Sequence, residues 1–244
     1  LFAALAAFAV IPVGPSVVVA GVTMPGSIAG LSVGLLYLVG VSSLGVYGLV
    51  LGGWSSGSKY SLIGGLRAAA QVVSYELILG MALVSVAIVA GTLSLDGIVA
   101  NQADRIPYFI LQPLAFLLYV VAAVAETNRA PFDLPEADTE LVAGYHTEYG
   151  GMRFAMFFIA EYVNVITVSA LAATMFFAGW SGPILPGPHW LFIKMLAFLF
   201  LFVWLRATLP RMRYDQLMRL CWSVLLPLAL INLLATAIAV AALG

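Results

Sequence analysis

The sequence is poor in charge and in cysteine, and each shortage excludes a class of protein. Only 9% of its 244 residues are charged, whereas a soluble domain usually carries about 25%. So few charges cannot cover a water-facing surface of this size, which excludes a soluble enzyme, a nucleic-acid-binding protein and a disordered chain. The single cysteine, Cys221, excludes a disulfide framework, a zinc cluster and an iron–sulfur cluster held by this chain alone.

Long apolar runs are what the sequence has in abundance. Hydrophobic residues make up 63% of the chain, and its mean hydropathy is +1.09. A bilayer core of about 30 Å needs roughly 20 apolar residues of helix, and runs of that order recur. They predict an all-α, polytopic transmembrane helix bundle that forms a single domain over residues 1–244. We expect about seven helices, the first one partial, near residues 1–12, 28–52, 68–91, 108–125, 154–178, 190–205 and 220–243.

The basic residues predict how this bundle is oriented. The connections 53–67, 126–153 and 206–219 fall on one side of the membrane and hold eight of the ten Lys and Arg residues. The positive-inside rule therefore places these three connections in the cytoplasm. The composition, rich in Ala, Val and Gly, favours a bacterial inner membrane over a mitochondrial one.

One connection, residues 126–153, is unusually long and acidic. It contains six of the eleven carboxylates and one of the two histidines, His146, while Pro131 and Pro135 prevent a continuous helix through its first half. A solvated acidic loop is the plain interpretation. Crowded carboxylates raise one another's pKa values, however, which suits proton storage and transfer. The six carboxylates are Glu126, Asp133, Glu136, Asp138, Glu140 and Glu148.

Two more carboxylates, Glu76 and Glu161, lie inside predicted spans. A charge in a span is costly, so such residues are candidates for function. Each follows or precedes a tyrosine, Tyr75 or Tyr162, and Asn164 lies about one helical turn beyond Glu161. A buried carboxyl that hydrogen-bonds a neighbouring helix would explain them, but the pattern favours a proton path.

The last cytoplasmic connection is basic. Setting the topology and contacting anionic lipid would explain its charges, and docking of a soluble partner is the sharper hypothesis. The candidate docking residues are Arg206, Arg211, Arg213 and Asp215. We find no phosphate-binding loop, no dinucleotide fingerprint and no set of metal ligands, so no metal site is expected.

Several stretches resemble one family. ETNRAPFDLPEADTELVAGYHTEY at 126–149 and FFIAEY at 157–162 are similar to the family of the H subunit (mitochondrial subunit 1) of proton-translocating NADH:quinone oxidoreductase, respiratory complex I. GWSSGSKYSLIGGLRAAAQVVSYE at 53–76 and RATLPRMRYDQLM at 206–218 match it too. The likeness covers the whole chain. It implies a family fold of eight helices, with a first helix and an Arg-rich amphipathic segment ahead of Leu1.

The resemblance implies a function in the membrane arm. Members of the family help form the tunnel through which quinone, the substrate, reaches the soluble arm, and they couple quinone reduction to proton movement without a redox centre of their own. NADH, FMN and the iron–sulfur clusters belong to partner subunits. The 126–153 loop, with Arg129 and its carboxylates, would couple the two processes, and Glu76 and Glu161 match carboxylates of the family's proton path.

One position departs from that pattern, and two other interpretations stay open. Some relatives have Glu in the third helix, where this chain has Ser43. The homologous membrane subunit of a membrane-bound hydrogenase or formate-linked complex would share the fold, with a nickel–iron partner. A stand-alone ion transporter would also tolerate buried carboxylates. The sequence does not distinguish ubiquinone from menaquinone as the substrate.

Overall fold

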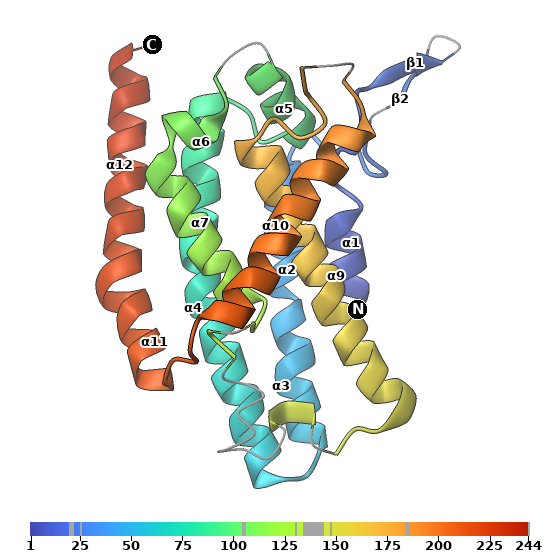
Figure 1. The fold of residues 1–244 in the computed structure, drawn as a ribbon, viewed down its shortest axis with the longest axis vertical. Helices are drawn as coiled ribbons and strands as arrows, with labels where there is room; N and C mark the ends of the chain where they lie inside the picture. Colours follow the sequence, from blue (N-terminus) through green and yellow to red (C-terminus); the bar gives the residue numbers. More distant parts are fainter. Residues whose placement is uncertain are drawn as a thin grey trace.

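The structure is a computed structural model that describes residues 1–19, 22–24, 26–103, 106–129, 131–133, 144–146, 148–183 and 186–243. Helices make up most of it (Figure 1). In chain order the elements are α1 (Phe2–Phe8), β1 (Val17–Val19), β2 (Val22–Met24), α2 (Gly34–Ser43), α3 (Gly45–Ser55), α4 (Lys59–Ala90), α5 (Leu95–Ala103), α6 (Tyr108–Leu111), α7 (Pro113–Glu126), η1 (Gly144–His146), α9 (Gly151–Phe176), α10 (Pro188–Thr208), α11 (Tyr214–Leu220), the π-helix η2 (Cys221–Leu225) and α12 (Leu226–Leu243).

The helices confirm a polytopic transmembrane bundle. Within the described residues, five helical stretches are long and apolar enough to cross a membrane, and the apolar helix α7 is shorter. The five stretches are Gly34–Ser55, Lys59–Ala90, Gly151–Phe176, Pro188–Thr208 and Tyr214–Ala242. With α7 they coincide with six of the predicted spans, and α1 falls in the partial first one. The chain is therefore a multi-pass membrane protein.

The connections divide between the two ends of the bundle. Figure 1 shows the end of α3, the start of α4 and η1 together at one end, with α5 and the β1–β2 hairpin at the other. The predicted cytoplasmic connections are shorter than expected. Only three residues separate α3 from α4, because α4 begins at Lys59, nine residues before the predicted start. Helices α10 and α11 likewise extend into the predicted 206–219 connection.

Helix α4 forms the centre of the bundle and packs most extensively against α3, α7 and α12. Glycine allows the closest of these approaches. A Cβ atom on Gly53 would lie 2.7 Å from the carbonyl oxygen of Ser61 and 3.2 Å from the Cα of Gly65. Small residues at such crossings let two backbones approach within van der Waals contact, which is a main source of helix association in lipid.

Polar contacts hold α12 against the same bundle. Asn232 donates to the hydroxyl of Ser85 on α4 at 3.2 Å, and Gln112 before α7 donates to the hydroxyl of Thr236 at 3.0 Å. Such hydrogen bonds help membrane helices to associate, because burial of apolar surface contributes little to helix association within lipid. At its base α12 is preceded by the π-helix η2. Pro227 is the second residue of α12, and a proline cannot donate the backbone hydrogen bond of a regular helix.

Three features of the fold did not follow from the apolar runs. Helix α5 and the β1–β2 hairpin lie in stretches for which we predicted no element. The predicted 28–52 span is broken at Leu44 into α2 and α3. The hydroxyls of Ser42 and Ser43 both donate to the carbonyl of Val39, and the amide of Leu44 bonds to Val41. Hydroxyls that bond to preceding carbonyls compete with the regular helical pattern.

A lysine closes the end of α9 that lies away from the predicted cytoplasmic side. Lys194 on α10 extends its ammonium group to the carbonyl oxygens of Phe177, Gly179 and Ser181, at 2.6, 2.8 and 2.6 Å. Phe177 is the C-cap of α9, where backbone carbonyls have no partner within the helix and carry partial negative charge, whereas Gly179 and Ser181 lie in the connection that follows. The three protons of the ammonium group therefore satisfy three acceptors and join α9 to α10.

Candidate functional site

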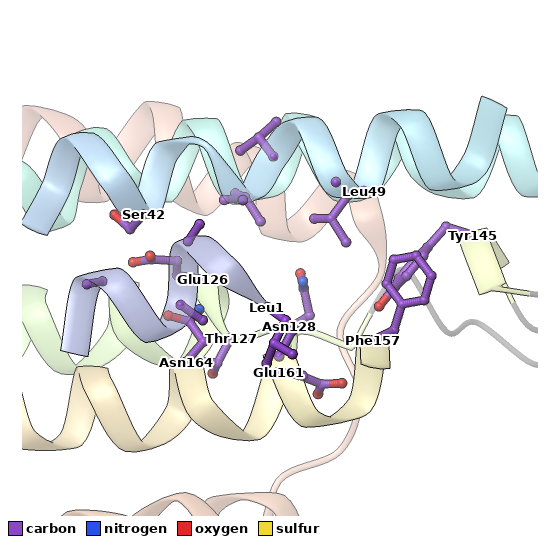
Figure 2. Close-up of a pocket in the computed structure, with 18 residues that line it drawn as sticks. Leu1, Ser42, Leu49, Glu126, Thr127, Asn128, Tyr145, Phe157, Glu161 and Asn164 are labelled. Atoms are coloured by element: carbon purple, nitrogen blue, oxygen red, sulfur yellow. The ribbon is translucent and has the colours of Figure 1, made fainter. Parts of the chain in front are cut away.

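The candidate site is a cavity of about 160 Å³ lined by residues of α1, α2, α3, α4, the end of α7, η1 and α9. Figure 2 shows Glu126 beside α1 and Ser42, and Glu161 and Asn164 along α9. Tyr145 and Phe157 lie together at the end nearest η1. The cavity is large enough to hold several water molecules. It brings together residues from the long loop and from the spans, which the sequence analysis had placed in two separate groups.

Glu126, the last residue of α7, is the most buried carboxylate of the cavity. It is only 7% exposed, and its Oε2 atom has no hydrogen-bond partner among the described residues. Asn128 also lines the cavity, and its buried Oδ1 atom likewise has no hydrogen-bond partner among the described residues. Buried polar atoms are nearly always hydrogen-bonded in proteins. Two such acceptors in one cavity therefore indicate a place for water or for a polar ligand.

Glu161 has the opposite electrostatic environment. Its Oε1 atom forms an ion pair with Nε of Arg129 at 2.9 Å, and the two side chains are 14% and 13% exposed. The guanidinium group of Arg129 also lies 4.6 Å from the centre of the Tyr162 ring, a cation–π contact. A nearby positive charge favours the ionised carboxylate. The cavity therefore holds one carboxyl group beside a cation and another that lacks one.

Glu76 lies next to the cavity rather than in its wall. Its Oε1 atom is hydrogen-bonded to the hydroxyl of Ser43, and its charge interacts with that of Glu126. Tyr75 is not part of this group. It is fully buried and donates its hydroxyl to the carbonyl of Leu217 at 3.1 Å. Consecutive residues of a helix point about 100° apart, so Tyr75 faces α11 while Glu76 faces α2.

The other candidates near Glu161 divide in the same way. Asn164 lies in the cavity wall. Tyr162 is 51% exposed and reaches the site only through its ring contact with Arg129. The structure therefore brings Glu126, Glu161 and Asn164 into one cavity, with Glu76 beside it, and leaves both tyrosines outside.

The described part of the long loop packs on the bundle through His146 and Tyr145. Both side chains are buried on η1. The carbonyl of Tyr145 accepts a hydrogen bond from Ser61 of α4 at 2.9 Å, and the His146 ring contacts Phe154 and Phe158 of α9. Asp133 is half-buried and Glu148 is exposed. The predicted loop residues Glu136, Asp138 and Glu140 lie outside the described residues.

The candidate docking residues lie at the predicted cytoplasmic end. Arg206, Arg211, Arg213 and Asp215 are all exposed. Their connection touches the other two, because the amide of Met212 donates to the carbonyl of Pro131 at 3.0 Å and Arg67 lies 5.7 Å from the Tyr214 ring. The three predicted cytoplasmic connections thus meet in one surface.

Sequence reasoning missed several residues of the site. Gln71, which is fully buried, donates both amide protons to the carbonyls of Ala125 and Phe132, at 2.7 and 2.9 Å, and so fixes the start of the long loop. An amide inside an apolar run was the signal that could have identified it. Asn128 gave no comparable signal, and Ser43 was noted only as the position where some relatives have Glu. Among the described residues no three His, Cys, Asp or Glu side chains lie close enough to hold a metal ion.

The comparisons with known proteins agree on one family. The family model described as NADH dehydrogenase matches residues 1–237. The H subunit of the NADH-quinone oxidoreductase of Thermomicrobium roseum is 56% identical over 234 residues, which cover 92% of this chain and 69% of that protein. The H subunit numbered 2 of the same enzyme in Syntrophobacter fumaroxidans is 54% identical, covering 96% and 70%. The H subunit numbered 1 of Geobacter sulfurreducens is 52% identical, covering 98% and 72%.

Proposed function

Because the chain belongs to the NADH dehydrogenase family, we propose that it is the H subunit of an NADH-quinone oxidoreductase, complex I, in a bacterial inner membrane. In this proposal the chain forms part of the quinone-binding tunnel at the junction with the soluble arm and couples quinone reduction to proton translocation. The observation that carries the proposal is the cavity in which Glu126, at the start of the long loop, and Glu161, in a membrane span, lie together.

The chain contributes no redox centre in this proposal. Its only cysteine, Cys221, is fully buried against the carbonyl of Ser74. NADH, FMN and the iron–sulfur clusters would belong to partner subunits, with quinone as the substrate. The exposed residues Arg206, Arg211, Arg213 and Asp215 would dock the soluble arm, and the apolar helices would contact the small membrane subunits and the antiporter-like subunits. Docking there would place the partner directly against the long loop, since the two connections touch at Met212 and Pro131.

The proton path begins at the loop. Reduction of a quinone takes up two electrons from a partner subunit and two protons, and the withdrawal of those protons would change the protonation of the loop carboxylates Glu136, Glu140 and Glu148. A proton can then pass by way of Glu126 to Glu161, because water in the cavity can bridge their oxygens, and on to Glu76, which lies beside the cavity. The ion pair with Arg129 favours the ionised form of Glu161, so Glu161 passes an incoming proton on and does not retain it. Tyr75 faces away and takes no direct part.

Substitution in the intact complex tests this path. Glu126→Gln, Glu161→Gln and Glu76→Gln each keep the size and polarity of the side chain but cannot carry a proton. We expect each variant to lower the rate of NADH-driven proton pumping by a factor on the order of 10²–10⁴, as for loss of a positioned acid–base group. Asp96→Asn, on the far side of the membrane, is the matched control and should pump normally. Wild-type pumping in all three glutamine variants would exclude the path.

Mass spectrometry of the proteins that co-purify with the full-length protein in mild detergent tests the assembly. Complex I predicts flavin and iron–sulfur subunits that oxidise NADH. A nickel–iron subunit would instead place the chain in a hydrogenase-type complex. Recovery of a stable chain alone would favour an ion transporter.

A further inference from the structure

Ser43 and Glu76 form a pair between two helices. Ser43 is the last residue of α2, and its Oγ atom contacts both Oε1 of Glu76 and the carbonyl oxygen of Val39, the latter at 3.0 Å. The pair lies beside the cavity, since Ser42 and Val72, one residue and one helical turn away, line it. Ser43 is therefore placed between a backbone acceptor and a carboxyl group of the proposed path.

The chemistry of a hydroxyl makes this position unusual. A serine hydroxyl carries one proton to donate and can also accept. When Glu76 is ionised, Ser43 donates its proton to the carboxylate. When Glu76 is protonated, the carboxylic acid donates to Ser43 Oγ, and the serine proton turns to the carbonyl of Val39. Glu76 thus keeps a hydrogen bond in both protonation states, and the serine hydroxyl keeps its own proton throughout.

The other two carboxyl groups of the site have different partners. Arg129, which holds Glu161, can only donate hydrogen bonds and so favours the ionised carboxylate. Oε2 of Glu126 has no partner among the described residues. A donor-only partner favours one protonation state, whereas a group that exchanges protons in each cycle must pass through both. The Ser43 hydroxyl can pair with both states of Glu76, whereas the Arg129 guanidinium favours the ionised state of Glu161.

We propose that Ser43 is a positioning residue that keeps Glu76 hydrogen-bonded in both states of a proton-transfer cycle. The inference rests on the proposed function, in which Glu76 carries protons. A proton reaches Glu76 from the cavity side as Ser43 turns toward Val39. It leaves toward the neighbouring membrane subunit as Ser43 turns back to the carboxylate.

Ionisable groups on the elements that pack against α4 contribute to any pH dependence. Helix α7 brings Glu126, and the cavity brings Glu161 and Arg129 from its far wall. The other elements packed on α4 bring Tyr37 on α2, Tyr47 on α3, Asp96 on α5, Tyr145 and His146 on η1 and Cys221 on η2, while the sequence of α12 has no acid or base. The test therefore compares variants that differ only at residue 43.

The experiment uses the intact complex in membrane vesicles. Ser43→Ala removes the hydroxyl, and Ser43→Thr retains it. Ser74→Ala is the matched control, because Ser74 also bonds to the carbonyl four residues before it, Ala70, and lies two residues from Glu76. We measure NADH-driven proton pumping and quinone reduction between pH 5 and pH 9. Glu76→Gln is measured beside these variants to test the proposed function itself.

Loss of the hydroxyl should slow pumping by a factor on the order of ten. A hydrogen bond to an ionised carboxylate is stronger than one to a neutral acid, so Ser43→Ala should also hold the proton on Glu76 to higher pH. The acid limb of the pumping profile should then move up by roughly half to one pH unit. Ser43→Thr should restore both rate and profile, and Ser74→Ala should change neither.

Infrared difference spectroscopy supplies a second readout. The carbonyl band of protonated Glu76 is identified by its loss in Glu76→Gln and should move to higher frequency in Ser43→Ala. If Ser43→Ala lowers the content of assembled complex, Ser43→Cys, with a weaker donor of similar size, gives the same comparison. An unchanged pH profile and band in the Ser43 variants, while Glu76→Gln stops pumping, would overturn this inference alone. Normal pumping in Glu76→Gln would overturn the role of Glu76 in the proposed function.

Discussion

An Arg129→Gln variant breaks the ion pair with Glu161 and leaves a polar side chain in its place. The two side chains are 13% and 14% exposed, and the N–O distance is 2.9 Å. Exposed pairs contribute roughly 0.2–1 kcal/mol, whereas breaking a fully buried pair costs about 3–5 kcal/mol. The pair lies between these limits, so we expect an interaction free energy of about 2 kcal/mol, which corresponds to about thirtyfold in a rate or equilibrium constant.

A double-mutant cycle isolates that interaction. Arg129→Gln, Glu161→Gln and the double variant are compared with the wild type by kcat/KM for quinone in the intact complex. Arg129→Gln alone should lower kcat/KM by about thirtyfold, because the whole interaction free energy is lost. Added to Glu161→Gln, the same substitution should cost less than about threefold, because the interaction is already absent. Arg219→Gln, which changes an exposed arginine, is the control and should have no effect. Fully additive losses would refute the electrostatic link between the two residues.

Three further predictions concern stability and loop order. Lys194→Met removes three hydrogen bonds to backbone carbonyls. It should lower the Tm of the solubilised protein by about ten degrees or more, since each such bond is worth about 1.5–3 kcal/mol and 1 kcal/mol shifts the Tm of a chain of this size by about 2–4 °C; Lys194→Arg should lower it less. Gly53→Ala places a Cβ 2.7 Å from a carbonyl oxygen and should cost about 1–3 kcal/mol, whereas Gly80→Ala, which meets open space, should leave the Tm nearly unchanged. Gln71→Leu frees two carbonyls at the start of the long loop and should speed limited trypsin cleavage at Arg129 severalfold, measured against the rate in the wild type.

The number and order of the spans could be predicted from the sequence because the bilayer imposes a simple requirement on them. A helix that crosses about 30 Å of hydrocarbon must be apolar over roughly 20 residues, and this pattern does not depend on neighbouring helices. The same solvent argument identified Glu76 and Glu161. Their charges stand out in apolar runs, and the structure places both at the cavity or next to it.

Helix ends and side-chain directions could not be predicted in this way. Helix α4 continues through the polar residues 59–67 because Gly64 and Gly65 let its backbone pack directly on η1 and α3, a tertiary contact that hydropathy does not report. The direction of Tyr75 depends on how α4 is rotated, and a helix covered on several sides has no apolar stripe that would reveal it. Ser43 was read as the absence of a carboxylate, whereas the structure shows it bonded to one.

The approach of Gly64 to η1 has a mechanical consequence. A Cβ atom on Gly64 would lie 3.1 Å from the Cα and carbonyl carbon of Gly144 and from the amide nitrogen of Tyr145. The two main chains are therefore in direct contact, because neither glycine has a side chain that could separate them. Closely packed backbone is stiff and transmits displacement with little loss. A shift of the loop at Gly144 would displace α4 directly. Because α4 is a continuous helix, the displacement would reach Glu76.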